Sequence, residues 1–280
     1  MDKKTFFIDL DGTLLTKAKI VTEETCKSLR RAAESGHKIV ICTGRSVHWF
    51  PRYVQNTPVR YVIGSSGAHI YDLQAKKSIY GNPLDAETLI KAVKAAQRPG
   101  VYFHFSAETG VYATERTRED ISAFRYTTYL EEDVEKWLRK NKVYQTMFIS
   151  YDVNQISQVR DELVGQGLLN GESCMQLTNQ SKAMTEPNKY PVNNYSFFEF
   201  NKGGCNKGVA VKKFCEMFNI PFEATVGIGD DLNDRRMFAA VSYKVAMKNA
   251  IAEIRELADR VIGSNENNGV AEFLEKFFVN

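Results

Sequence analysis

Short, continuously apolar segments that stop at an acid, a threonine or a glycine constrain the fold of this chain most strongly. Three of them occur early, at residues 5–10, 38–42 and 60–63. Such runs are typical of strands buried on both faces of a sheet. Between the first two, an amphipathic pattern runs from Thr22, a suitable N-cap, to Gly36, a suitable helix end. Strand, helix and strand in this order predict a βαβ unit and therefore a parallel sheet.

The carboxyl-terminal part of the chain repeats this alternation. We expect strands at 197–200, 224–228, 244–247 and 260–262, with helices at 207–218, 233–240, 250–257 and 270–278. The two ends of the chain therefore predict one parallel-sheet domain that combines residues 1–83 and 195–280.

The middle of the chain follows a different pattern. Residues 101–106 and 111–114 alternate in polarity around a glycine-containing turn, which predicts a β-hairpin. A helical pattern follows at 155–164. We therefore predict that residues 84–194 form an α+β domain inserted into the first domain, within an α/β fold class.

Composition excludes several other classes of protein. The 37 Lys and Arg residues nearly balance the 34 Asp and Glu residues, so the net charge of +3 does not indicate a nucleic-acid partner. No apolar run approaches the roughly 18 residues of a membrane span. The five cysteines include no C-x-x-C pair, which favours reduced thiols in the cytoplasm over disulfides or a zinc site. We expect a cytoplasmic protein without a membrane partner, and its oligomeric state is not predicted.

Two acids directly follow the first apolar run, in the segment Asp9-Leu10-Asp11-Gly12-Thr13. Residues two apart on an extended chain face the same side, so Asp9 and Asp11 would enter the crevice where open parallel sheets bind ligands. Like charges this close require a cation, or a proton on one of them. An ordinary surface turn is the alternative interpretation.

Two further segments place polar groups after predicted strands. Thr43 and Gly44 follow the second run and would form a phosphate cradle at a helix start, or else an ordinary turn. Asp230, Asn233 and Asp234 follow a later strand. Their oxygens suit Mg²⁺, although capping of the next helix is an equally good explanation.

Two basic residues accompany these segments. Lys207 opens a predicted helix, where the helix dipole disfavours a cation. Its position makes sense if it holds a phosphoryl oxygen or offsets the acids, and a solvated surface lysine is the alternative. Arg45, directly after Gly44, either acts near a phosphate or is an ordinary residue of a helix start. Because parallel strands end on one edge of a sheet, all these segments together predict a single site.

Four segments, those that contain Asp9, Thr43, Lys207 and Asp230, resemble the four motifs of the haloacid dehalogenase superfamily of phosphotransferases. Within it the chain is similar to the Cof-type phosphatases of sugar phosphates and small metabolites, whose cap is inserted between the second and third motifs. Residues 245–250, 258–259 and 268–271 also resemble the Cof-type carboxyl-terminal region. The resemblance implies a Rossmann-like core with an inserted α/β cap that encloses a small phosphorylated metabolite and sets specificity.

The resemblance also implies roles for individual residues. Asp9 would be the nucleophile that forms an aspartyl-phosphate, and Asp11 would be the general acid and then the general base. Mg²⁺ would bind the side chains of Asp9 and Asp230 and the main-chain carbonyl of Asp11, with Asp234 supporting the ion. The phosphoryl group would be bound by Leu10, Thr43, Gly44, Lys207 and Asn233.

The implied function is that of a Mg²⁺-dependent phosphatase of a small metabolite. A phosphomutase with the same Asp9 chemistry and a phosphate-binding regulator without turnover are the alternatives. A dinucleotide-binding module is disfavoured because no G-x-G-x-x-G follows the first strand. One departure from the Cof-type pattern concerns the substrate: Ser66 stands where these proteins usually have an asparagine before the glycine.

Overall fold

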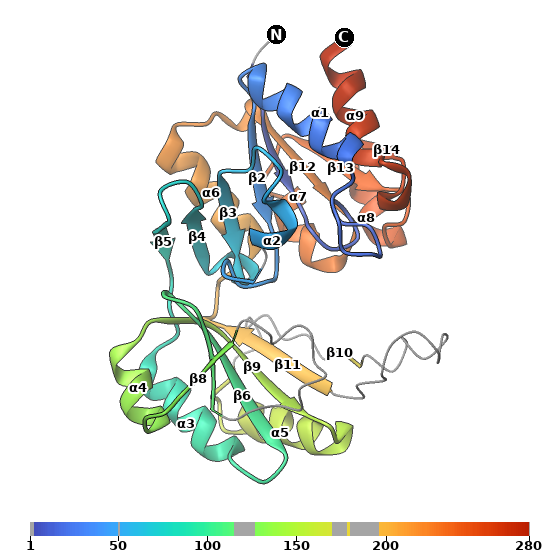
Figure 1. Ribbon diagram of the computed structural model, residues 1–280. Coiled ribbons are helices and arrows are strands. Elements are labelled where there is room, and N and C mark those ends of the chain that lie inside the picture. Colours follow the sequence, from blue (N-terminus) through green and yellow to red (C-terminus); the bar gives the residue numbers. More distant parts are fainter. Residues whose placement is uncertain (1–2, 50, 115–126, 170–177, 180–195, 280) are drawn as a thin grey trace. The chain divides into compact units, whose positions relative to one another are not determined.

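The computed structural model describes residues 3–49, 51–114, 127–169, 178–179 and 196–279. The chain forms two units, the first made of Met1–Gly81 and Asn206–Asn280 and the second of Asn82–Cys205. Each unit has its own sheet and its own helices (Figure 1). The first unit contains all the residues for which the sequence predicts a catalytic or binding role.

The first unit is built on an eight-stranded sheet in the order β14-β13-β12-β1-β2-β3-β4-β5. Neighbouring strands from β14 to β3 are parallel, whereas β4 and β5 are antiparallel additions at the edge. The predicted parallel-sheet core is confirmed, and the antiparallel hairpin was not predicted. The strands are β1 (Thr5–Ile8), β2 (Lys38–Cys42), β3 (Tyr61–Gly64), β4 (His69–Asp72), β5 (Lys77–Gly81), β12 (Thr225–Gly229), β13 (Tyr243–Met247) and β14 (Arg260–Ile262).

The helices of this unit begin and end close to the predicted positions. Thr22 caps the first one as expected, because its hydroxyl accepts a hydrogen bond of 3.2 Å from the amide of Thr25. The helix predicted at 233–240 is instead a 3-10 turn followed by a short helix. The elements are α1 (Glu23–Glu34), α2 (Pro51–Val54), α6 (Lys207–Phe218), α7 (Arg235–Phe238), α8 (Ala252–Leu257) and α9 (Gly269–Val279), with the 3-10 turns η1 (Ser65–Gly67), η4 (Phe222–Ala224), η5 (Leu232–Asp234) and η6 (Asn265–Asn267).

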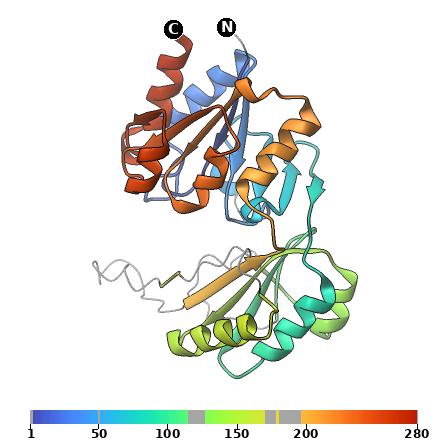
Figure 2. The same cartoon turned by 180° about the vertical axis from the view of Figure 1, so that it is seen from behind.

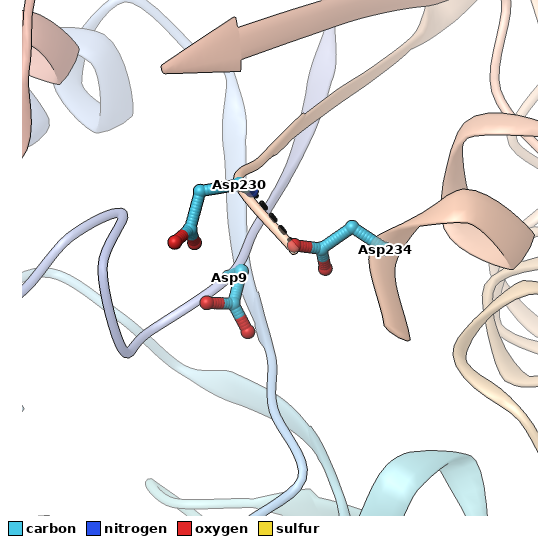
Figure 3. Close-up of side chains that lie close together, drawn as sticks. All are labelled: Asp9, Asp230 and Asp234. Atoms are coloured by element: carbon cyan, nitrogen blue, oxygen red, sulfur yellow. Dashed lines mark hydrogen bonds between the residues drawn. The ribbon is translucent and has the colours of Figure 1, made fainter. Parts of the chain in front are cut away.

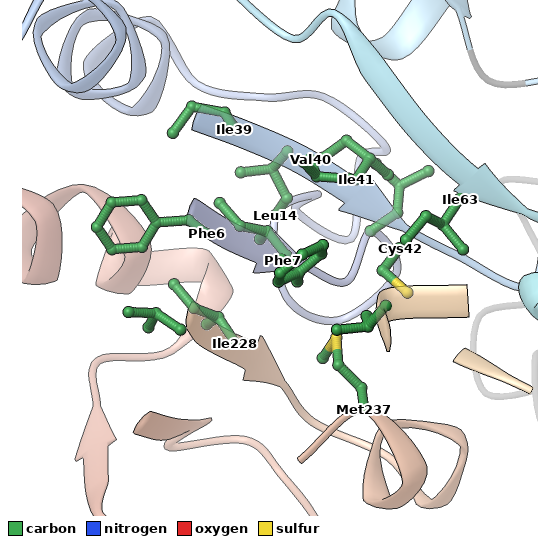
Figure 4. Close-up of a cluster of buried hydrophobic side chains, with 14 of the residues drawn as sticks. Phe6, Phe7, Leu14, Ile39, Val40, Ile41, Cys42, Ile63, Ile228 and Met237 are labelled. Carbon is green, nitrogen blue, oxygen red and sulfur yellow. The ribbon is translucent and has the colours of Figure 1, made fainter. Parts of the chain in front are cut away.

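Two adjacent phenylalanines show why β1 is apolar along its whole length. Side chains alternate across a strand, so Phe6 and Phe7 point to opposite faces of the sheet. Phe6 meets Phe277 of α9 at a ring-centroid distance of 5.5 Å, and Phe7 meets Phe214 of α6 at 5.8 Å. Helices therefore cover both faces of β1, as Figures 1 and 2 show, and Figure 4 shows the buried side chains around it.

The order of the strands places a ligand crevice beside β1. The chain runs from β1 through β2 to β3 on one side, and from β12 through β13 to β14 on the other. Successive strands are therefore added in opposite directions across the sheet, starting from the neighbouring strands β1 and β12. In open α/β sheets, ligands bind outside the carboxyl ends of the strands at such a switch point. Residues that directly follow β1 and β12 are therefore in the position of a binding site.

The second unit has a six-stranded sheet in the order β10-β11-β9-β6-β7-β8. Its pairs are antiparallel, except that β7 and β8 are parallel. Strands β6 and β7 form the predicted hairpin. The elements are β6 (Val101–Ala107), β7 (Val111–Ala113), β8 (Thr127–Tyr129), β9 (Val143–Ser150), β10 (Thr178–Asn179) and β11 (Ser196–Asn201), with helices α3 (Ala86–Ala96), α4 (Val134–Lys140) and α5 (Val153–Gly165).

Strand β11 differs from the sequence-based expectation, which placed it in the core. It pairs with β9, and its inward side chains Phe198 and Phe200 are buried against the apolar cluster of the second unit. The second unit accordingly runs from Asn82 to Cys205. An apolar strand pattern predicts burial but not which of two sheets the strand joins, so the pattern alone misplaced this element.

No helix among the described residues has both the length and the apolar composition required to cross a membrane. The cysteines that the structure describes, Cys26, Cys42, Cys205 and Cys215, form no disulfide with one another.

The packing of β1 against α6 generates a prediction about stability. Phe214 is fully buried, and its replacement by alanine would leave a cavity beside Phe7 and Tyr61. We expect Phe214→Ala to destabilise the protein by about 3–5 kcal/mol, measured as a lowered midpoint of thermal unfolding. Phe222→Ala is the matched control, since Phe222 is 56% exposed and its loss should leave the midpoint nearly unchanged. Equal effects of the two substitutions would contradict this account.

Candidate active site

Asp9 lies at the switch point, directly after β1. Its amide donates a hydrogen bond of 2.9 Å to the carbonyl of Ile228 in β12, which continues the pairing of the two strands and fixes the position of the residue. Asp9 is buried, with 4% of its surface exposed. Its Oδ1 accepts a hydrogen bond of 2.6 Å from Nζ of Lys207. The first predicted acid and the predicted lysine are therefore in direct contact.

Lys207 is buried at the start of α6, with 1% of its surface exposed. Its ammonium group contacts Asp234 Oδ1 at 2.7 Å and Asn233 Oδ1 at 3.3 Å, in addition to Asp9. The alternative interpretation, a solvated surface lysine, is wrong. The unfavourable position at the start of a helix is offset by two carboxylates within ion-pair distance.

Three carboxylates gather at this point. Asp9, Asp230 and Asp234 each provide an oxygen atom within 4.8 Å of the others, and Figure 3 shows their side chains close together. With Lys207 they carry three negative charges and one positive charge when all are ionised. The excess of two negative charges, on hard oxygen atoms, matches a divalent cation such as Mg²⁺. The donor set therefore fits the predicted metal.

The acids in the loop after β12 both cap a turn and gather near Asp9, although the sequence left helix capping and metal binding as alternatives. Asp231 caps η5, since its Oδ1 accepts a hydrogen bond of 2.7 Å from the amide of Leu232. Asp234 folds back so that its Oδ2 accepts hydrogen bonds from the amides of Asp230 and Asp231, at 2.9 and 3.2 Å. These contacts leave the side chain of Asp230 to face Asp9 (Figure 3).

The segment after β1 holds the side chain of Asp230. Thr13 donates a hydrogen bond of 2.6 Å from its hydroxyl to Asp230 Oδ1. Gly12 has a φ of +84°, and a Cβ atom at this position would overlap the carboxylate of Asp230. Only glycine both adopts this backbone conformation readily and leaves room for the acid. The side-chain amide of Asn249 donates a hydrogen bond of 2.8 Å to the carbonyl of Gly12 and supports the turn.

Burial and crowding change the ionisation of these acids. Burial raises the pKa of Asp9 well above its usual range; Lys207 opposes this shift, while the charges of Asp234 and Asp230 add to it. Burial likewise raises the pKa of Asp230 to about 6, against the hydrogen bond from Thr13. Burial alone would lower the pKa of Lys207, but Asp234 and Asp9 raise it, so the lysine is cationic. When all three carboxylates are ionised, the charge of Lys207 therefore leaves two of the three negative charges uncompensated.

Asp11 has a different environment from Asp9. Its carboxylate accepts hydrogen bonds from Nε and Nη2 of Arg45, at 2.6 and 2.7 Å, and from Nζ of Lys19 at 2.6 Å. Burial opposes its ionisation, but the contacts with the two cations prevail and lower the pKa of Asp11 to about 2. The side chain of Asp11 therefore pairs with Arg45 and Lys19, whereas the predicted extended chain placed it beside Asp9 with a shared cation or with a proton on one of the acids.

The remaining predicted residues lie at the same edge of the sheet. Leu10 is buried between the two acids of the first segment. In the register of β1 and β2, Ile8 pairs with Ile41, so Thr43 and Gly44 leave the sheet near Asp9. No helix starts at Gly44, so the predicted helix start is wrong, and the phosphate-binding role of Thr43 and Gly44 stays a prediction. The amide of Arg45 instead donates to the hydroxyl of Thr43 at 3.2 Å, which forms a tight turn.

Sequence reasoning missed two contributors to this arrangement, Thr13 and Lys19, and left the role of a third, Arg45, open. Thr13 lies within the first segment, and its hydroxyl, directly after Gly12, could have been recognised in the sequence as a hydrogen-bond donor to an acid of the site. Arg45 was left between two interpretations, and its guanidinium also lies 5.1 Å from the ring centre of Tyr53. Lys19 gave no signal, because it reaches Asp11 only through the conformation of the loop after β1.

Comparison with known proteins agrees with this geometry. The family model of haloacid dehalogenase-like hydrolases matches residues 6–274. The chain belongs to the haloacid dehalogenase-like hydrolase family. This match confirms the predicted superfamily, and the relatives named as phosphatases confirm the predicted enzyme class, a phosphoric monoester hydrolase.

Relatives of this hydrolase extend over its whole length. It is 26% identical to the 5-amino-6-(5-phospho-D-ribitylamino)uracil phosphatase YitU of Bacillus subtilis, with 99% of each chain covered. It is 23% identical to the pyridoxal phosphate phosphatase YbhA of Escherichia coli, with 98% of each covered. A solved haloacid dehalogenase-like hydrolase from Bacteroides thetaiotaomicron has a TM-score of 0.78 and 19% identity, covering 99% of this chain and 100% of that one. That likeness confirms the α/β fold.

The raised pKa of Asp230 generates a prediction about metal binding. Below pH 6 this side chain is largely neutral in the metal-free protein and is a poor ligand; above pH 6 it is ionised. We expect Mg²⁺ to bind about tenfold more weakly at pH 5 than at pH 7, since metal binding displaces the proton. Isothermal titration calorimetry at the two pH values checks this. An affinity that does not change with pH, or normal binding in Asp230→Asn, would contradict it.

Proposed function

We propose that this hydrolase is a Mg²⁺-dependent phosphatase that acts on a small phosphorylated metabolite through an aspartyl-phosphate on Asp9. The buried contact of 2.6 Å between Lys207 and Asp9 carries this proposal, since it orients the carboxylate and supplies a cation where phosphate would arrive. The relatives' names, which specify 5-amino-6-(5-phospho-D-ribitylamino)uracil and pyridoxal phosphate, support a small phosphorylated metabolite as the substrate class.

The proposed chemistry proceeds in two steps. A carboxylate oxygen of Asp9 attacks phosphorus, and the bond between phosphorus and the ester oxygen breaks as the alcohol leaves with a proton. Water then attacks the aspartyl-phosphate, which restores Asp9 and releases inorganic phosphate. A covalent nucleophile divides one difficult hydrolysis into two easier steps. Positioning and neutralisation of charge account for most of the catalysis of such transfers.

Residues around Asp9 would bind the phosphoryl group. Lys207 brings positive charge, and Asn233, which contacts it at 3.3 Å, brings an amide. The hydroxyl of Thr43 and the amides of Leu10 and Gly44 lie at the same edge of the sheet and would supply further donors. Each of these groups can donate a hydrogen bond to an anionic oxygen without itself reacting.

The side chains of Asp9 and Asp230 and the main-chain carbonyl of Asp11 would hold Mg²⁺. When bound, Mg²⁺ would let the carboxylate of Asp9 and an anionic phosphate approach each other. Both oxygens of Asp234 already accept hydrogen bonds from Lys207 and from backbone amides. Asp234 therefore suits a supporting role, in which it fixes Lys207 and the loop that carries Asp230.

Asp11 is proposed as the residue that moves protons. Its ionised state, with a pKa of about 2, suits the second step, in which a base accepts a proton from water. Donation to the leaving alcohol in the first step requires that Asp11 first take up a proton. The contacts with Arg45 and Lys19 oppose this, so we propose that they loosen in the substrate complex, where phosphate competes for the cations.

The inserted unit, Asn82–Cys205, is proposed to set substrate specificity, as the family resemblance implies. A phosphomutase with the same nucleophile is the second candidate, and it would require a bisphosphate activator and release little phosphate. A non-catalytic regulator would bind Mg²⁺ and a phosphate analogue without turnover. The complete set of acids around Lys207 favours the phosphatase over the regulator.

A panel of phosphorylated metabolites with Mg²⁺ tests this proposal by measuring the phosphate released. We expect release from a subset of the panel by the wild type, and a loss of at least about 10³-fold in Asp9→Asn, because the amide is not a nucleophile. The panel should include sugar phosphates, pyridoxal phosphate, flavin mononucleotide and nucleotides.

Asp231→Asn is the matched control for this substitution. It makes the same change of acid to amide in an exposed residue whose capping role asparagine can also fulfil. Its activity should remain close to that of the wild type. Turnover retained in Asp9→Asn would show that the nucleophile is misassigned, and activity only with a bisphosphate would favour the mutase.

A further inference from the structure

The turn η1 after β3 has a backbone conformation that is unusual for its residues. Ser65 and Ser66 have φ values of 49° and 51°, and Gly67 follows with 99°. Left-handed conformations are costly for residues with a side chain, and two of them in succession are uncommon. Such strain persists where surrounding contacts impose it, and it is frequent at functional sites.

Contacts with the proposed phosphate-binding segments impose this conformation. The amide of Ser65 donates to the carbonyl of Arg45 at 2.8 Å, and the amide of Ser66 donates to the carbonyl of Thr43 at 3.2 Å. On the other side, a Cβ atom on Gly67 would overlap the carbonyl of Asn206, the residue before Lys207. The turn thus joins the Thr43 segment to the start of α6.

Ser66 is 6% exposed, and its hydroxyl forms no hydrogen bond within the described part of the chain. The oxygen itself is not among the buried unpaired atoms of the described residues, so it is accessible to water or to a ligand. A hydroxyl in this state can donate a hydrogen bond to a bound anion. Its Oγ lies 3.4 Å from the point that a Cβ atom of Gly44 would occupy. The absence of a side chain at Gly44 therefore leaves this hydroxyl uncovered beside the phosphate-binding turn.

We propose that Ser66 is a further substrate-binding residue, whose hydroxyl donates a hydrogen bond to a phosphoryl oxygen of the substrate. The ligand class is a phosphate monoester dianion, and inorganic phosphate shares the recognised group. The inference rests on the proposed phosphatase function and adds a donor to it. The strained turn fixes this donor against Thr43 and Gly44, so no side-chain rearrangement of the turn is required when the anion binds.

The experiment compares Ser66→Ala and Ser66→Gly with the wild type, all loaded with Mg²⁺. Both variants remove the hydroxyl, but glycine also relieves the backbone strain at φ 51°. Measurements are the inhibition constant of inorganic phosphate, KM and kcat for several substrates, and the midpoint of thermal unfolding. We expect both variants to bind phosphate about tenfold more weakly, and KM to rise for every substrate, since a hydrogen bond to a charged group is lost.

Ser78→Ala is the matched control. It removes a hydroxyl in β5 of the same sheet, which contacts Nε2 of His69 at 3.0 Å, and phosphate binding should not change. The inference is overturned if Ser66→Ala and Ser66→Gly bind phosphate as the wild type does. It is also overturned if only Ser66→Ala is weakened, which would indicate a purely backbone role, or if KM rises for some substrates only, which would indicate a contact with the leaving group.

The outcome is separable from that of the proposed function. A wild type that neither binds phosphate nor hydrolyses any substrate with Mg²⁺ contradicts the phosphatase proposal itself. An active wild type with unaffected Ser66 variants contradicts only the role of Ser66.

Discussion

The buried ammonium of Lys207 is the interaction on which the arrangement of the site depends. Asp9 and Asp234 are as buried as the lysine, and carboxylates in such positions are stable only with a cation at short range. Its ion pairs reach Asp9, which is 198 positions away in the sequence, and Asp234, which is 27 positions away. One side chain at the start of α6 thus connects the segment after β1 with the loop after β12. Removal of its charge would leave two buried acids without their cation, and breaking a buried ion pair in this way is strongly destabilising.

The sheet brings these segments together before any side chain interacts. Because β1 has parallel neighbours on both sides, its carboxyl end lies beside those of β12 and β2. Phe6 and Phe7, which pack on opposite faces, hold the strand between two layers of helices. Such a strand cannot shift by one residue without reversing the direction of each side chain. The position of Asp9 is therefore determined by the apolar packing of β1.

Sequence reasoning succeeded where one local pattern had one structural consequence. Apolar runs predicted the parallel strands, and acids after those runs predicted the edge at which Asp9 and Asp230 meet. It failed where two partners were equally compatible with a pattern. β11 has the same apolar alternation whichever sheet it joins, and its pairing with β9 is a contact between distant segments. The conformation of Ser65 and Ser66 was likewise unpredictable, because left-handed backbone at serine results from contacts with Thr43 and Arg45.

The two acids of the first segment illustrate the limit of spacing arguments most clearly. Asp9 and Asp11 are two residues apart, yet β1 ends at Ile8 and the chain turns at Gly12, so the extended geometry that would align them is lost. Asp9 meets Lys207 and other acids, and its pKa rises; Asp11 meets Arg45 and Lys19, and its pKa falls to about 2. In the metal-free protein the two carboxyl groups therefore differ in their ionisation: burial favours the neutral form of Asp9, whereas the two cations hold Asp11 in its ionised form. The turn at Gly12 thus separates the environments of two otherwise equivalent side chains.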